Sequence, residues 1–189
     1  MYFLFQGMMV LAAANDSLEL SFAKEVLLLT DSEYGFLVSI AGAGFILGAI
    51  TNAILSKKLT PSLLIGIGSL FIAIGYIIYA FSNEFLIAAI GFFILSFSMA
   101  YANTGFNTFY QNNVPVHIMG RIGSIYGLFI AGITILITIL FGVATQFISI
   151  QLVVIIGSLV MLFITIILCV FTLLPSHSKV HSSESIHSK

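Results

Sequence analysis

Long apolar stretches separated by short polar segments dominate this sequence. Asp, Glu, Lys and Arg are all absent from residues 34–56, 59–83, 85–120 and 122–178. A helix needs about 20 apolar residues to cross a bilayer, because its backbone polar groups must be paired within the helix. The pattern therefore predicts complete spans at about 34–56, 62–81, 85–108, 122–142 and 151–174.

The N-terminal segment is less regular than the rest. Residues 2–14 are apolar apart from Gln6, but they are too few for a full span. A signal peptide is one interpretation, yet no Lys or Arg precedes Lys24 to provide its basic region. We interpret 2–14 as a shortened first span whose beginning is missing. Residues 17–29 then form the connection to the second span and are expected to hold a short interfacial helix.

Composition and the remaining polar residues narrow the class of protein. Of the 189 residues, 60% are hydrophobic and 7% charged, which is far from the balance of a soluble domain. The continuous apolar stretches favour helices over the alternating strands of a membrane β-barrel. We therefore predict an all-α membrane protein with a six-helix transmembrane bundle over 1–174 and a disordered tail over 175–189.

Several functional classes find no support in the residues. A net charge of −1 without a basic cluster gives no footprint for nucleic acid. The single cysteine, Cys169, excludes an internal disulfide and a cysteine-based metal site. No catalytic set or phosphate-binding loop is present, so we expect neither an enzyme nor a bound cofactor or metal.

The basic residues predict the orientation. With six spans, five of the six basic side chains fall on one side of the membrane: Lys57, Lys58, Arg121, Lys179 and Lys189. Cytoplasmic loops carry the excess of Lys and Arg. We therefore expect a multi-pass protein of the cell membrane with both termini in the cytoplasm. The sequence Thr30-Asp31-Ser32-Glu33 is a capping box that would open the second span.

Small residues follow one another at four-residue steps on two of the predicted spans. Gly44 and Gly48 lie on the second span, where Asn52 continues the same face, and Gly123 and Gly127 lie on the fifth. Such stripes let helix backbones approach closely. They indicate tight packing, and smooth contacts of this kind would also let helices rock against a partner.

Amide side chains gather at the end of the fourth span. Asn103, Asn107 and Gln111 are each four residues apart and so share one helix face. Buried amides facing lipid would be unfavourable by several kcal/mol, by order of magnitude, so this face must meet protein or water. Two interpretations stay open: hydrogen bonding between helices, or the wall of a substrate path that also includes Asn52.

Several short motifs recur in a known family of membrane proteins. They are Phe22-Ala23-Lys24-Glu25-Val26-Leu27, Ser32-Glu33-Tyr34-Gly35-Phe36-Leu37 with Gly42-Ala43-Gly44, Leu55-Ser56-Lys57-Lys58-Leu59, and Gln111-Asn112-Asn113-Val114-Pro115. Together they resemble the major facilitator superfamily, in particular its bacterial macrolide- and drug-efflux-like branch. The resemblance aligns the chain with helices 7–12 of that family. The acidic residue of the family's loop motif is absent beside Lys57 and Lys58.

The resemblance implies half of a major facilitator bundle, built as a three-plus-three inverted repeat and packed on a homologous N-terminal half. It implies secondary-active efflux of an amphiphilic small molecule by alternating access. Because no charged residue is predicted at mid-membrane depth, proton coupling is expected to reside in the other half. Besides the lipid bilayer, the expected partner is an N-terminal six-helix half or a second copy of the chain. The alternative is a non-transporting membrane protein or the inert product of a truncated permease gene.

Overall fold

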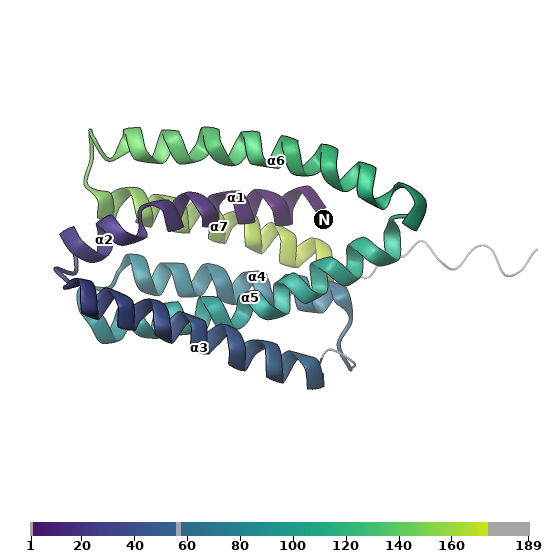
Figure 1. Cartoon of the computed structure of the whole chain (residues 1–189), viewed down its shortest axis with the longest axis horizontal. Coiled ribbons are helices and arrows are strands. Elements are labelled where there is room, and N and C mark those ends of the chain that lie inside the picture. Colours follow the sequence, from purple (N-terminus) through teal and green to yellow (C-terminus); the bar gives the residue numbers. More distant parts are fainter. Residues whose placement is uncertain (1, 56–57, 174–189) are drawn as a thin grey trace, which may run out of the picture.

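The computed structural model describes residues 2–55 and 58–173, and these ranges fold into helices joined by short connections (Figure 1). The helices within them are α1 (Tyr2–Ser17), α2 (Glu19–Glu25), α3 (Asp31–Leu55), α4 (Pro61–Ala80), α5 (Phe85–Asn113), α6 (Val116–Ala144) and α7 (Ile150–Leu173). Five of them, α3 to α7, are long and apolar enough to cross a membrane. The all-α membrane fold is therefore confirmed, and the 16-residue α1 corresponds to the shortened first helix.

The connection between α1 and α3 contains the expected short helix, α2, which is confined to Glu19–Glu25. The capping box that follows is also confirmed. The side chain of Glu33 accepts hydrogen bonds from the backbone N–H and the hydroxyl of Thr30, both at 2.8 Å, and the N–H of Glu33 donates to Thr30 Oγ1 at 3.3 Å. These bonds pair donors that the first turn of α3 leaves without a partner.

Two helices extend further than their apolar stretches. α5 continues to Asn113 rather than ending near residue 108, and α6 begins at Val116 rather than near residue 122. Polar side chains do not interrupt the backbone hydrogen bonds of a helix, so the polar end of α5 stays helical. Pro115 separates the two helices because it has no N–H to continue the ladder. At the start of α4, Pro61 occupies the first turn behind the cap residue Thr60.

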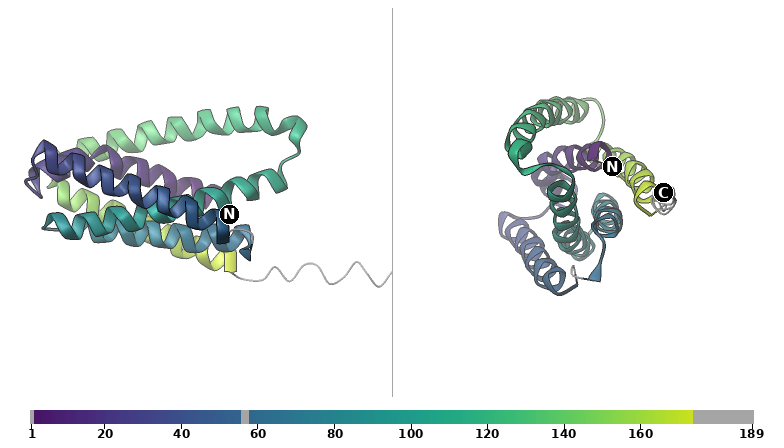
Figure 2. Two further views of the ribbon diagram at one scale, coloured as in Figure 1. Left: turned by 60° about the horizontal axis from the view of Figure 1, so that its bottom comes forward. Right: turned by 90° about the vertical axis from the view of Figure 1, so that its right-hand side faces the viewer.

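The centre of the fold is the pair α4 and α5, which pack closely along their length. Gly75 and Gly91 face each other there: a Cβ on Gly91 would lie 2.8 Å from the carbonyl oxygen of Gly75, and the reverse distance is also 2.8 Å. Only residues without a Cβ allow this approach. The end-on view in Figure 2 (right) shows α4 and α7 on one side of the bundle and α3 and α6 at its two edges.

The two small-residue stripes have different surroundings. Gly44 and Gly48 of α3 lie directly against α5, where added Cβ atoms would overlap the carbonyl oxygens of Phe93 and Phe97. By contrast, nothing lies within 4 Å of a Cβ on Gly127, and Gly123 meets only the Tyr110 hydroxyl at 3.2 Å. The stripe on α6 thus faces open space in this chain.

The apolar surface is arranged for contact with lipid or protein. α6 packs mainly on α1 and has no buried residue, and large side chains such as Leu128, Leu136 and Ile139 are more than half exposed. Such a contiguous apolar face is unfavourable in water. Of the sequence predictions, those for Lys57 and for the tail 175–189 fall outside the described residues.

Candidate functional site

A polar groove lies between α3 and α5 towards the end of the bundle away from α2. Its volume is about 290 Å³. The lining combines small or apolar residues with hydroxyl and amide groups: Phe45, Ala49, Asn52, Ala53, Ala100, Asn103, Thr104 and Asn107. The four-residue steps of α5 bring Asn103 and Asn107 to one face, and the close approach of α3 at Gly48 brings Asn52 beside them. The lining contains no charged side chain.

Asn52 is the most constrained residue of this groove. It is only 4% exposed, and its side-chain nitrogen donates to Thr104 Oγ1 at 2.6 Å and to the carbonyl of Ala100 at 3.3 Å. Thr104 in turn donates to the same carbonyl at 2.9 Å. The side-chain oxygen Oδ1 of Asn52 has no hydrogen-bond partner. A buried acceptor left unpaired costs about 1–3 kcal/mol, so the packing of α3 on α5 at Asn52 carries an energetic cost.

The other predicted site residues lie elsewhere. Gln111, one helical turn beyond Asn107, is exposed and does not line the groove. Lys58 and Arg121 are exposed at the same end of the bundle, in the α3–α4 connection and in the first part of α6. The structure therefore brings three of the four predicted path residues into one site.

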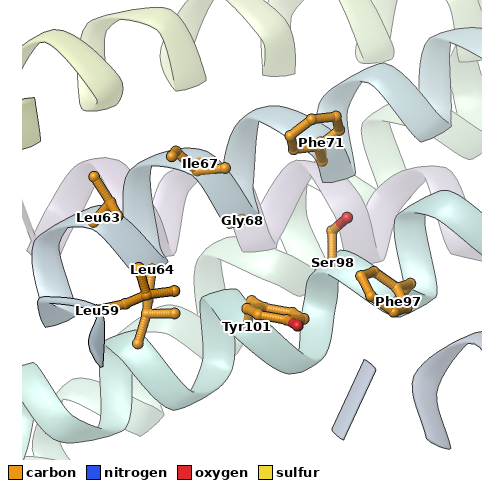
Figure 3. Close-up of a pocket in the computed structure, with 9 residues that line it drawn as sticks. All are labelled: Leu59, Leu63, Leu64, Ile67, Gly68, Phe71, Phe97, Ser98 and Tyr101. Carbon is orange, nitrogen blue, oxygen red and sulfur yellow. The ribbon is translucent and has the colours of Figure 1, made fainter. Parts of the chain in front are cut away.

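Two further cavities are almost wholly apolar. One, of about 180 Å³, lies between α4 and α5 and is lined by aliphatic and aromatic side chains together with Ser98 and Tyr101 (Figure 3). Both hydroxyls are already engaged: Ser98 donates to the carbonyl of Ile94 at 2.8 Å and Tyr101 to Thr51 Oγ1 at 2.8 Å. This cavity can hold hydrocarbon but offers little polar recognition.

The second apolar cavity, of about 300 Å³, lies where the start of α1 meets the end of α5 and the start of α6. Tyr2, Tyr110 and Tyr126 contribute aromatic rings to its wall. The rings pack on one another, with 5.2 Å between the centroids of Tyr2 and Tyr126. The Tyr110 hydroxyl donates to the carbonyl of Met119 at 3.0 Å, which joins α5 to α6.

A carboxylate–tyrosine network at the α2 end of the bundle was not anticipated from the sequence. The Tyr76 hydroxyl donates to Asp16 Oδ1 at 2.5 Å, and the Tyr34 hydroxyl donates to Glu19 Oε1 at 2.9 Å. The Tyr79 hydroxyl adds a hydrogen bond to the backbone carbonyl of Glu19 at 3.1 Å. Acidic side chains of α1 and α2 thus accept hydrogen bonds from tyrosines of two spans, α3 and α4.

Glu19 is the half-buried acid of this network, and it lies in α2, outside the membrane-spanning helices. Burial raises its pKa to about 7, the negative charge of Asp16 adds to the rise, and the hydrogen bond from Tyr34 opposes it. A signal for the network exists in the sequence. Tyr76 and Tyr79 are three residues apart and lie on one face of α4, whereas Asp16 and Glu19, which are close in the sequence, lie in the last turn of α1 and at the start of α2.

Comparison with known proteins identifies the family. The family model described as transmembrane secretion effector, of the major facilitator superfamily, matches residues 8–189. The chain belongs to this family, and it is therefore a multi-pass membrane protein of a transporter family rather than of an enzyme family. No match was found among curated proteins or among solved structures.

Proposed function

We propose that this chain is the C-terminal six-helix half of a secondary-active efflux permease. In this proposal the polar groove between α3 and α5 is part of the wall of the substrate path. The observation that carries the proposal is the lining of this groove, where the amides of Asn52, Asn103 and Asn107 lie among small and apolar residues. Amide groups in an uncharged, amphiphilic groove suit a substrate that brings hydrogen-bonding groups on an apolar body.

The open faces of α3 and α6 support a second half as partner. α6 has no buried residue, and its stripe at Gly127 has open space beside it. Small-residue stripes on membrane helices are typical of interfaces where another helix approaches closely. We propose that a homologous N-terminal half, or a second copy of this chain, packs there and completes the path between the two halves.

Alternating access would then expose the groove first to one side of the membrane and then to the other. We propose export as the direction because of the resemblance to drug-efflux permeases. We place both termini in the cytoplasm because Lys58 and Arg121 lie at the end of the bundle that the charge bias assigns to the cytoplasm. The groove contributes hydrogen bonds and shape, and because its lining has no charged side chain, it suits amphiphiles of the drug or macrolide kind without selecting them by the sign of their charge.

The test is an efflux assay in cells without endogenous pumps, with ethidium as the probe. Cells expressing this chain alone should accumulate ethidium like empty cells, whereas co-expression with an N-terminal half from the same family should lower accumulation. Asn103→Leu and Asn107→Leu should each abolish the efflux that co-expression produces, so that ethidium accumulation returns to the level of empty cells. Asn112→Leu, on the exposed end of α5 outside the groove, is the matched control and should retain it.

Two results would contradict the proposal. Robust efflux by a demonstrated monomer would show that no second half is needed. Unchanged efflux in both Asn variants would show that the groove is not in the path. If the chain alone exports ethidium and crosslinks as a specific dimer in membranes, the homodimeric permease replaces the two-half arrangement. If no combination exports any probe, the non-transporting alternative holds.

A further inference from the structure

The carboxylate–tyrosine network joins helices that otherwise share few contacts. α1 and α4 pack only weakly, yet the buried Tyr76 of α4 bonds to Asp16 and also approaches the carbonyl of Ala12, 3.4 Å from its hydroxyl. Tyr34, near the start of α3, reaches back fifteen residues to Glu19. The α1–α2 corner is therefore held to α3 and α4 by tyrosine hydroxyls together with the buried ring of Phe22, which packs on Tyr79 with 4.6 Å between the centroids.

Within residues 2–55 and 58–173, no Lys or Arg forms an ion pair with Asp16 or Glu19. Among residues 2–55 and 58–173 the ion pair that forms is Lys24 to Asp31, at 2.7 Å, so the lysine nearest in sequence to Glu19 is already bound. The titratable groups facing Glu19 from the packed helices are Asp16 of α1, Tyr34 of α3, and Tyr76 and Tyr79 of α4. α7, which also touches α2, has no charged residue.

We infer that Glu19 is the proton-binding group of a latch that holds the α1–α2 corner against α3 and α4. With its proton, the carboxyl group is neutral and remains in its half-buried place, still able to accept the Tyr34 hydroxyl. When the proton leaves to bulk water, the carboxylate is left partly desolvated beside the negative charge of Asp16. The ionised form gains by moving into water, and the corner loosens.

The sign of the pH dependence follows from the direction of the pKa shift. Glu19 has a pKa of about 7 in the latched structure against 4.5 for a free glutamate, so the latched state binds the proton more tightly. The contribution of Glu19 to the closed corner is therefore complete below 4.5, the pKa of a free glutamate, and it is lost as the pH rises towards 7. The ratio of closed to open corner changes by about two orders of magnitude at most over that window.

This latch goes beyond the proposed function because it gives the described half its own proton-sensitive element. Its existence does not require transport; only its link to a transport cycle rests on the proposed permease. Since Glu19 lies at the end of the bundle assigned to the outside, the latch would respond to the pH outside the cell.

The test uses the full chain in protein-free lipid bicelles and follows tyrosine emission from about pH 4 to about pH 9, a range that spans the titration of a shifted carboxyl group. The sequence contains no Trp, so tyrosine emission is not masked. We expect a transition with its midpoint near 7 that disappears in Glu19→Gln. Glu25→Gln, exposed on the same helix, is the matched control and should keep the transition unchanged.

Two further variants test the mechanism through opposite shifts. Asp16→Asn removes a negative neighbour and should move the midpoint to lower pH, whereas Tyr34→Phe removes the bond that favours the ionised form and should move it to higher pH. If Asp16 and Tyr34 only supported the structure, the midpoint would not shift in opposite directions in these two variants. The two shifts also test the role of Glu19 if Glu19→Gln fails to fold.

Hydrogen–deuterium exchange of the backbone amides of α2 measures directly how often the α1–α2 corner opens. After correction for the intrinsic rate, exchange in the parent should accelerate as pH rises through the midpoint, while Glu19→Gln should stay slow. A transition that persists in Glu19→Gln, or midpoints that do not move in Asp16→Asn and Tyr34→Phe, would overturn the inference. Loss of ethidium efflux with these readouts intact would count against the permease and not against the latch.

Discussion

The contact of α3 with α5 at Gly48 allows a quantitative test of how the groove is built. In Gly48→Ala the new Cβ would overlap the carbonyl oxygen of Phe97, which is backbone and cannot rotate away. α3 must therefore shift. On the same helix, Gly42 has open space, so Gly42→Ala adds the same methyl group without a clash. The pair of variants differs only in the close approach.

The difference in stability between the two variants measures the close contact alone, because the change in helix propensity is the same in both. Replacing Gly by Ala inside a helix gains about 1 kcal/mol, and this gain applies to both variants. Overpacking a close contact costs about 1–3 kcal/mol, and this cost applies to Gly48→Ala alone. Gly42→Ala should thus be slightly more stable than the parent, and Gly48→Ala should be less stable than Gly42→Ala by about 1–3 kcal/mol.

The assay is reversible unfolding in mixed micelles with an increasing fraction of sodium dodecyl sulfate, followed by far-ultraviolet circular dichroism. Asn52 lies one turn beyond Gly48, so the shift of α3 should also lengthen its hydrogen bond to Thr104, now 2.6 Å, and lower efflux in the two-half assay. Equal unfolding midpoints for Gly42→Ala and Gly48→Ala would refute the claimed backbone contact.

Three other predictions follow from single contacts. Asn15 is 2% exposed, and neither Nδ2 nor Oδ1 of its side chain has a hydrogen-bond partner. Asn15→Ala should therefore leave the free energy of unfolding unchanged or raise it by up to about 2 kcal/mol, whereas truncation of a buried side chain usually lowers it. Thr30→Val removes the capping hydroxyl of α3 and should lower stability in the same assay by about 1 kcal/mol. Gly127→Leu meets open space and should not change the stability of the isolated chain, but it should prevent co-purification with an N-terminal half.

The sequence was informative about the helices because lipid imposes a simple rule on them. Every apolar stretch read from the gaps between charges contains a helix in the structure, and the capping box of Thr30 and Glu33 is formed. Helix ends were harder to predict where polar residues continue a helix, as in α5 up to Asn113. Hydropathy reports where a chain contacts hydrocarbon, whereas helix ends depend on caps and on Pro115.

The most extensive helix contact, between α4 and α5, was also not predicted, although the glycines that allow it are visible in the sequence. Gly68 and Gly75 are seven residues apart, and Gly91 and Gly105 fourteen, so each pair recurs on one helix face. These glycines bring α4 and α5 into backbone contact: a Cβ on Gly105 would lie 2.8 Å from the backbone nitrogen of Ile65. Attention to four-residue steps alone favoured α3 and α6 instead.

By itself the sequence determined that this is a helical membrane protein, because the bilayer forces every long uncharged stretch into a helix. Which faces of those helices meet was decided by the tertiary structure. Gly48 and Gly127 occupy similar stripes, yet one lies against a neighbouring backbone and the other faces open space. Likewise nothing in the local sequence marks Asp16 and Glu19 as partners of tyrosines, and the packing of α3 and α4 brings Tyr34 and Tyr76 to them. Burial and proton affinity depend on neighbours distant in the chain, which local patterns do not encode.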